Sequence, residues 1–231
     1  MSKYVVIGLG VFGRQVALTL AEEGAEVIAV DSDMERVEEI HDYVAYSVRL
    51  DSTDSSALRS LGLQDMDAGV VAIGENFEAN VLTAAYLKQL GVPKVVTRAA
   101  NPIHRKILQQ IGVDEIISPE DEVGRKTAQR LLRPYLIDYL DITGEYKLVR
   151  LDTPKEFINR TLGEIDLRKN YNVIVISILK KEKQEQAGEK TVSESTYEIV
   201  PDAETTLEKN TVLVLVGKEE DINNFTDRFH S

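Results

Sequence analysis

The chain has 231 residues and a formal net charge of −12 at pH 7, from 27 basic and 39 acidic side chains. Apolar residues make up 43 % and charged residues 29 %, which is the composition of a globular protein rather than a disordered one. The length allows one large domain or two small ones with buried cores. The acidic balance argues against sequence-independent nucleic-acid binding. The absence of cysteine excludes disulfides, cysteine zinc sites and thiol nucleophiles.

No segment holds the roughly 20 consecutive apolar residues that a membrane-spanning helix needs. The first residues contain one lysine and an apolar strand that runs into glycines, which is unlike a signal peptide. We therefore expect a cytoplasmic protein that acts at a membrane only as a peripheral subunit, at the inner face.

Short β-branched runs alternate with amphipathic segments through the first half of the chain. The expected strands are 4–7, 26–30, 44–48, 69–73, 95–98 and 115–117. The expected helices between them are 14–23, 33–42, 55–61, 76–90 and 102–111. This alternation predicts right-handed βαβ crossovers and an α/β fold with a Rossmann-like, doubly wound parallel sheet.

The pattern changes near residue 119. Apolar residues keep a helical spacing over 119–140, where Pro134 is expected to kink or split the helix. The later part has expected strands over 147–151, 173–179, 197–200 and 211–216, a polar hairpin loop over 180–195 and a terminal helix over 219–229. We expect an α/β domain over 1–118, a helical connector and dimerisation segment over 119–143 and a smaller α+β module over 144–231.

A glycine-rich turn joins the first expected strand to the first helix. Its G-x-G-x-x-G pattern consists of Gly8, Leu9, Gly10, Val11, Phe12 and Gly13. In this context Gly8 allows a tight turn, Gly10 lets a pyrophosphate approach the backbone, and Gly13 lets helix and strand pack closely. The N-terminus of the helix offers free N–H groups to phosphate. The alternative is a glycine turn without a ligand.

An acid ends the second expected strand, as a dinucleotide-binding turn requires. Asp31 stands there, followed by Ser32. A carboxylate at this point hydrogen-bonds ribose hydroxyls and repels a 2′-phosphate, so NADP is disfavoured.

Polar residues follow the later strands, at the edge where open parallel sheets bind ligands. These further candidates are Asp51, Ser52 and Thr53 after the third strand, Ile73, Gly74, Glu75 and Asn76 after the fourth, and Arg98 at the end of the fifth. Arg98 has the charge and the planar fork to bind phosphate. The alternatives are helix caps and turns for the first two groups and a surface ion pair for Arg98.

The sequence contains no recognisable catalytic constellation. The histidines at 41, 104 and 230 have no metal-ligand spacing, and no Walker A lysine motif occurs. The C-terminal module offers no obvious proton donor for a nicotinamide dehydrogenase. We therefore expect no enzyme, and an NAD-dependent oxidoreductase with an unrecognised donor is the alternative.

Together these motifs resemble the RCK (or KTN) domain of Trk and Ktr potassium uptake systems and of ligand-gated potassium channels. The N-terminal resemblance rests on residues 6–13, 29–31, 51–54, 71–76, 98–101, 111–114 and 117–120, and the C-terminal one on 162–168, 173–176 and 213–217. It implies a regulatory subunit without catalysis, whose dimers assemble into an octameric ring under an integral-membrane potassium-translocating subunit. Nucleotide-dependent change of the ring gates the pore. The alternative is a nucleotide-binding regulator of a different transporter.

The resemblance also implies ligands. It places an adenine nucleotide (ADP, ATP, AMP or NAD(H)) over the glycine turn. Ktr-type members often carry arginine where this chain has Val11, and the missing guanidinium favours AMP, ADP or NAD(H) over ATP. Glu120 matches an acid that in some members helps to hold a divalent cation. The alternative for Glu120 is an acid at a helix N-terminus.

The C-terminal module resembles one that binds cyclic di-AMP in some relatives. Arg168, Asn172 and Val173 stand at matching positions. The alternative is an ion pair of Arg168 with Asp166 or a neighbour, with the other residues in the core and in a turn.

Overall fold

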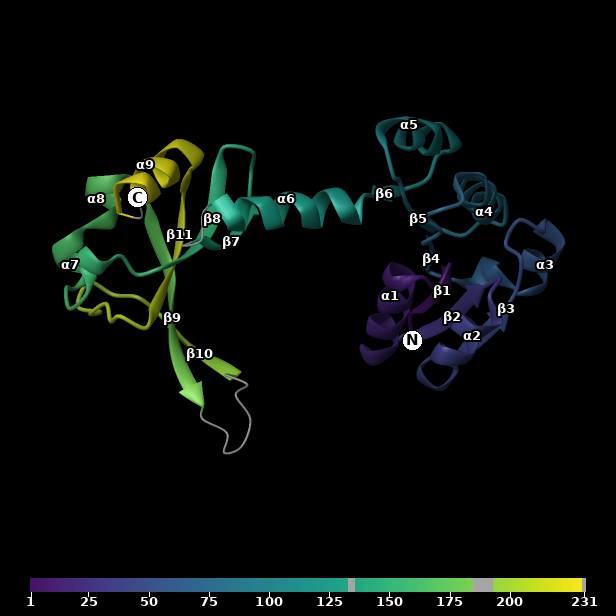
Figure 1. Cartoon of the computed structure of the whole chain (residues 1–231), viewed down its shortest axis with the longest axis horizontal. Coiled ribbons are helices and arrows are strands. Elements are labelled where there is room, and N and C mark those ends of the chain that lie inside the picture. Colours follow the sequence, from purple (N-terminus) through teal and green to yellow (C-terminus); the bar gives the residue numbers. More distant parts are fainter. Residues whose placement is uncertain (133–135, 185–192, 230–231) are drawn as a thin grey trace. The chain divides into compact units, whose positions relative to one another are not determined.

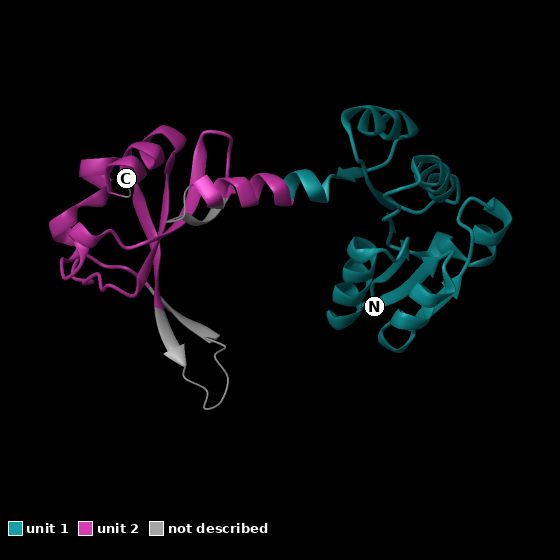
Figure 2. Cartoon of the chain, viewed as in Figure 1, with its two compact units in different colours: residues 1–122 teal, residues 123–231 magenta. Residues whose placement is uncertain are grey.

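The computed structural model describes residues 1–132, 136–184 and 193–229 (Figure 1). The chain divides into two units, Met1–Glu122 and Val123–Ser231 (Figure 2). Helix α6 (Pro119–Leu132) begins in the first unit and continues into the second. Within the described ranges, no helix has both the length and the apolar character needed to cross a bilayer.

A six-stranded parallel sheet with helices on both faces forms the first unit. Its strands are β1 (Lys3–Ile7), β2 (Glu26–Asp31), β3 (Tyr46–Arg49), β4 (Ala68–Val71), β5 (Lys94–Arg98) and β6 (Glu115–Ile117). Its helices before α6 are α1 (Val11–Glu22), α2 (Met34–Ile40), α3 (Ser55–Ser60), α4 (Phe77–Gln89) and α5 (Pro102–Ile111). The strand order is β3-β2-β1-β4-β5-β6, which confirms the predicted doubly wound sheet.

Short polar side chains fix where the helices of this unit begin. Asp33 accepts a hydrogen bond from the N–H of Glu35, and Asp54 accepts from the first N–H groups of α3. Asn76 and Asn101 cap α4 and α5 in the same way. These caps satisfy N–H groups that have no partner inside the helix. They set the helix starts close to the strand ends, where the pocket described below opens.

Alternate residues of the central strands point to opposite faces, and both faces are buried. Val6 of β1 packs with Ala17 of α1 and Val37 of α2 in one core cluster. Val5 of the same strand packs with α3, α4 and α5 side chains, among them Leu87, in another. The continuously apolar strands are therefore explained by helices on both sides of the sheet.

A charge-assisted contact ties β5 to the start of β6 and gives this unit a pH dependence. Asp114 accepts the N–H of Val95 at 2.6 Å and the Lys88 ammonium at 3.0 Å. The Val95 N–H, followed by Lys88, holds the pKa of Asp114 below its usual value. Because the folded pKa is lowered, this stabilisation is complete above the ordinary carboxyl pKa and is lost as pH falls through the folded pKa.

We therefore expect Asp114→Asn to lower the free energy of unfolding at pH 7 by about 1 kcal/mol, since the carboxylate is partly exposed. The difference from the wild type should shrink as pH falls from 5 towards 3. Urea denaturation at pH 7, 5, 4 and 3 measures it, with Asp42→Asn as the control at an exposed acid. A difference that stays constant with pH would contradict the assignment.

The second unit is an antiparallel α+β module, as predicted. Its strands are β7 (Leu136–Asp141), β8 (Tyr146–Asp152), β9 (Ile174–Gln184), β10 (Ser193–Ile199) and β11 (Thr211–Lys218), in the order β10-β9-β11-β8-β7. Its further helices are α7 (Leu162–Ile165), α8 (Leu167–Tyr171) and α9 (Glu219–Phe229). Phe157, Tyr171, Phe225 and Phe229 form an aromatic cluster between the helices and the sheet.

The prediction of a helix up to residue 140 is wrong in its last part. Helix α6 ends at Leu132, Pro134 lies outside the described residues, and β7 pairs with β8 from residue 136 on. The turn between β7 and β8 is closed by Asp141, which accepts the N–H of Gly144 at 2.7 Å. Gly144 has a φ of 68°, a left-handed conformation that glycine adopts readily. The hairpin supplies backbone hydrogen bonds that outweigh the helical spacing.

The predicted loop over 180–195 is also too long. Strand β9 continues to Gln184, and β10 begins at Ser193, with Glu194 paired to Lys183. Residues 185–192 lie outside the described residues. Ladder hydrogen bonds between backbones require no apolar side chains, so polar composition alone does not exclude a strand.

Candidate nucleotide-binding site

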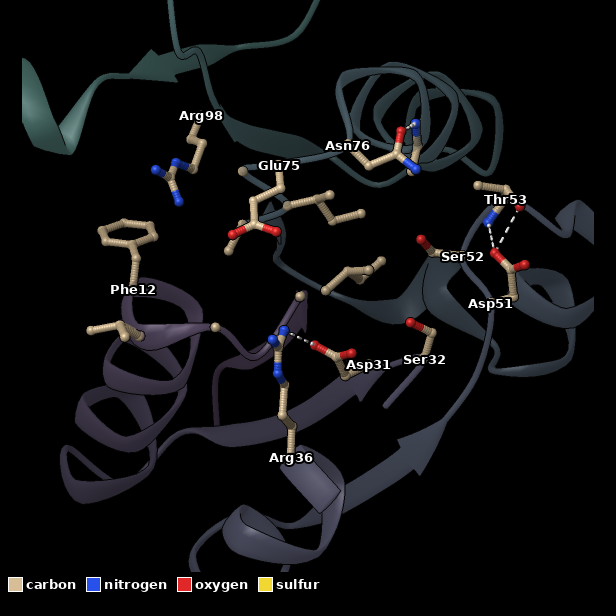
Figure 3. A pocket seen from close by; sticks show the side chains of 18 of the residues that line it. Phe12, Asp31, Ser32, Arg36, Asp51, Ser52, Thr53, Glu75, Asn76 and Arg98 are labelled. Atoms are coloured by element: carbon tan, nitrogen blue, oxygen red, sulfur yellow. Dashed lines mark hydrogen bonds and ion pairs between the residues drawn. The ribbon is translucent and has the colours of Figure 1, made fainter. Parts of the chain in front are cut away.

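A pocket of about 960 Å³ opens at the carboxyl ends of the strands of the first unit (Figure 3). It lies where the strand order reverses between β1 and β4, the place where open α/β sheets bind ligands. Its lining consists of Ile7, Gly8, Gly10, Val11, Phe12, Gln15, Asp31, Ser32, Arg36, Leu50, Asp51, Ser52, Thr53, Ala72, Ile73, Gly74, Glu75, Asn76, Ala79, Arg98 and Glu120. Residues that are separated by more than a hundred positions in the sequence thus line one pocket.

Two predicted ligand residues do not line the pocket, namely Leu9 and Gly13. The Leu9 side chain is buried in the core cluster with α1 and α2, and its N–H donates to Asp31. Gly13 lies where α1 crosses the turn, and a Cβ there would overlap the carbonyl oxygen of Gly8. The Leu9 N–H is therefore already engaged, and Gly13 serves the close packing of α1 on the turn.

Gly10 differs from the other two glycines of the motif. Its φ of −62° and ψ of −179° are accessible to any residue, and a Cβ built on it meets no atom within 4 Å. The fold itself therefore does not require glycine at position 10. Among the described residues no side chain caps α1 at Gly10, so the first N–H groups of α1 are left for another partner. Open space beside an uncapped helix start is what a phosphate group needs.

Asp31 is held in place by the turn that it faces. Its side chain is 7 % exposed, and its Oδ2 accepts the Leu9 N–H at 2.6 Å while Oδ1 accepts the Asp33 N–H at 2.9 Å. Because both oxygens are fixed by backbone donors, the carboxylate is preorganised at the end of β2. This is the position at which an acid binds ribose hydroxyls.

Arg36 is a pocket residue that the sequence analysis missed. It lies on α2 and approaches Asp31 at 3.6 Å and Asp33 at 3.7 Å, so its charge is shared between two carboxylates. A basic residue five positions after the acid is the signal that was available. Exclusion of a 2′-phosphate stays a prediction, since an arginine here is also a group that binds such phosphates.

The turn after β3 is stiffened by its own hydrogen bonds. Asp51 Oδ1 accepts both the N–H of Thr53 at 2.9 Å and its hydroxyl at 2.7 Å, and these bonds, the hydroxyl first, lower the pKa of Asp51. Ser52 is buried and its Oγ accepts the Thr83 hydroxyl at 2.7 Å. These residues therefore build a turn that lines the pocket, while helix capping, the alternative interpretation, is the role of Asp54.

Asn80 is a second missed residue and supports the pocket from below. It is buried in the first turn of α4, where its Nδ2 donates to the Ile73 carbonyl at 2.8 Å and its Oδ1 accepts the Thr97 hydroxyl at 3.0 Å. These bonds join the ends of β4 and β5. No local sequence signal marks an asparagine inside a helix for this role.

Arg98 and Glu120 form an ion pair at one end of the pocket, where Figure 3 also shows Phe12 and Glu75. The guanidinium packs on Gly74, since a Cβ at position 74 would lie 2.5 Å from Nη1. The structure thus shows both predicted features of Arg98, a place in the pocket and an ion pair. Among the described residues, no group of three or more His, Cys, Asp or Glu is arranged for a metal, so the cation role of Glu120 stays a prediction.

The three C-terminal candidates are separated by burial. Arg168 and Asn172 are exposed, whereas Val173 is fully buried, so its side chain is unavailable to a ligand. Asn172 donates to Asp221 at 3.1 Å, and Asp166 accepts the N–H of Lys169.

The strand order, the glycine turn and the acid at the end of β2 define a Rossmann-type nucleotide-binding domain, here joined to an antiparallel module. Comparison with known families agrees: the TrkA-N domain matches residues 4–119 and the TrkA-C domain matches residues 147–230. The chain belongs to the family of proteins that combine these two domains.

Relatives match along almost the whole chain. The Ktr system potassium uptake protein C of Bacillus subtilis (strain 168) is 34 % identical over 226 residues, which cover 98 % of this chain and 96 % of that protein. The Ktr system potassium uptake protein A of the same organism is 32 % identical over 223 residues, covering 96 % and 95 %. These matches confirm the resemblance read from the motifs.

Among solved structures, the GsuK channel bound to NAD covers all of this chain with 40 % of its own, at a TM-score of 0.64 and 17 % identity. At this identity the likeness concerns the fold alone. It extends over both units, so the α+β module as well as the parallel sheet has a counterpart of known structure.

Proposed function

We propose that this chain is a cytosolic, nucleotide-sensing regulatory subunit of a potassium-transporting membrane protein. The observation that carries the proposal is the match to two Ktr potassium uptake proteins over nearly the full length of all three chains. The pocket supplies the sensing site that a regulatory subunit needs, and its size is that of a small-molecule site.

The proposed ligand is an adenine nucleotide, with its phosphate or pyrophosphate over Gly10 and its ribose on Asp31. The uncapped start of α1 and the preorganised carboxylate support these two contacts. Val11 lines the pocket with an exposed apolar side chain and brings no charge to a γ-phosphate. AMP, ADP and NAD(H) are therefore favoured over ATP.

Regulation without catalysis fits the lining of this pocket. Neither histidine nor cysteine is among the lining residues, and Ser52, the buried hydroxyl, is engaged with Thr83. A nucleotide then acts only by binding two conformations of the assembly with different affinities.

The assembly that we propose is a dimer that builds an octameric ring on the membrane partner. Helix α6 supports packing against a second copy, because Val123, Leu131 and Leu132 are exposed along it. A divalent cation at Glu120 and cyclic di-AMP beside Arg168 and Asn172 are further ligands that the family resemblance proposes.

The proposal predicts nucleotide-dependent potassium uptake. In cells that depend on this chain and its membrane partner, Gly10→Ala should reduce uptake to the level seen without the chain, because the methyl group occupies the pyrophosphate position. Glu22→Ala at the other end of α1 is the control, since Glu22 is exposed and lies outside the pocket. Normal uptake with the Gly10 variant, or uptake of another ion only, would contradict the proposal.

A further inference from the structure

We propose that the Arg98–Glu120 ion pair is a switch operated by phosphate. When a nucleotide binds, its phosphates replace Glu120 as the partner of Arg98, and the first turn of α6 is released. This inference rests on the proposed function, because it needs a phosphate-bearing nucleotide in the pocket. Arg98 is the last residue of β5, and Glu120 is the second residue of α6. The pair therefore connects the pocket to the helix that continues into the second unit.

Arg98 is held ready for an anion. Its side chain is 19 % exposed, and its guanidinium packs on the backbone of Gly74, where any side chain would displace it. Its Nε is buried and has no hydrogen-bond partner within the part of the chain that the structure describes. A guanidinium has five N–H donors, and Glu120 satisfies few of them. The remaining donors favour a second acceptor in the pocket.

Glu120 binds the Arg98 guanidinium only weakly. Its side chain is 64 % exposed, so water screens the ion pair and solvates the carboxylate readily once it is released. A phosphate group carries more charge and matches the planar fork of arginine with two parallel hydrogen bonds. Exchange of Glu120 for phosphate is therefore favourable at Arg98.

The other charged residues of the pocket are less suited than Arg98 to bind phosphate. Asp31, Asp51 and Glu75 are acids and repel phosphate, and Arg36 is already shared by Asp31 and Asp33. Arg98 is thus the cation of the lining whose single carboxylate partner is exposed. It also lies at the same end of the pocket as Phe12 of the glycine turn (Figure 3).

Calorimetric titrations with ADP and with adenosine, both in EDTA, test the exchange on the full chain. Glu120→Gln removes the competitor and should raise ADP affinity about two- to fivefold. Arg98→Ala removes the phosphate partner and should lower ADP affinity about ten- to hundredfold. Adenosine, which has no phosphate, should bind all variants equally. EDTA removes any divalent cation through which Glu120 would act on ADP.

Two matched measurements separate the switch from a general effect of charge. Glu122→Gln, also on the first turns of α6 but outside the pocket, should leave ADP affinity unchanged. In the Arg98→Ala background, Glu120→Gln should have no effect on ADP. Hydrogen exchange over 119–132 should be faster with ADP than with adenosine, and Glu120→Gln should show this faster exchange without a ligand.

Two results would overturn the switch while leaving nucleotide binding intact. One is a Glu120→Gln variant whose ADP affinity is unchanged or lower than that of the wild type. The other is hydrogen exchange in α6 that ADP and adenosine affect equally. A wild-type chain that binds none of ADP, AMP and NADH would instead remove the proposed function on which the switch rests.

Discussion

Gly13→Ala is expected to destabilise the first unit by about 3 kcal/mol or more. The added methyl group would clash with backbone atoms, which cannot move aside as the end of a flexible side chain can. A Cβ at this position overlaps the Gly8 carbonyl oxygen and lies 2.8 Å from the Ala72 Cβ. Helix α1 would have to move away from β1 and β4, which form the centre of the sheet. Thermal unfolding followed by circular dichroism measures the loss, and a melting temperature equal to that of the wild type would contradict the close packing.

Gly10→Ala is the informative partner of that variant. Since its Cβ meets nothing within 4 Å and its φ is −62°, the variant should keep the wild-type melting temperature. Its affinity for ADP should nevertheless fall at least about tenfold, the cost of losing a charge-assisted hydrogen bond. The two glycines thus separate the demands of the fold from those of the ligand. Equal behaviour of the two variants would contradict this separation.

Asp31→Ala is expected to weaken nucleotide binding by about 1–3 kcal/mol, the range for a hydrogen bond to a charged group. It should also reduce stability, because the N–H groups of Leu9 and Asp33 lose their acceptor and Leu9 is buried. Calorimetry with ADP and urea denaturation measure the two effects separately.

The matched control is Asp54→Ala. It removes an acid that caps a helix, α3, but it lies outside the pocket lining and leaves Arg36 with both of its carboxylates. It should cost about 1 kcal/mol of stability and leave ADP affinity unchanged. An Asp31 variant that binds ADP as tightly as the wild type would mean that the ribose contact lies elsewhere.

Much of the first unit follows from local patterns in the sequence. Apolar runs such as Val5–Ile7 alternate with capped amphipathic helices, which is enough to predict a parallel sheet. Residues that follow separate strands, such as Asp31 and Arg98, then meet because the carboxyl ends of parallel strands share one edge. Their convergence in one pocket could therefore be predicted from the sheet topology alone, without any knowledge of side-chain contacts.

The features that were not predictable depend on contacts between distant segments. The Arg98–Glu120 pair and the Asn80 bridge join residues whose proximity depends on register and helix position. Strand β7 was mistaken for a helix because its pairing with β8 outweighs its own spacing. The short helix α7 is different, because it has a local signal in the sequence, the capping box of Thr161 and Glu164.

Calorimetric titration of the full chain with ADP, AMP and NADH is the decisive measurement of nucleotide binding in the pocket. At least one of them should bind at one site per chain, and Gly10→Ala should weaken that binding, whereas Glu22→Ala should not. A folded wild-type chain that binds none of these compounds, or a Gly10 variant that binds as tightly as the wild type, would contradict it.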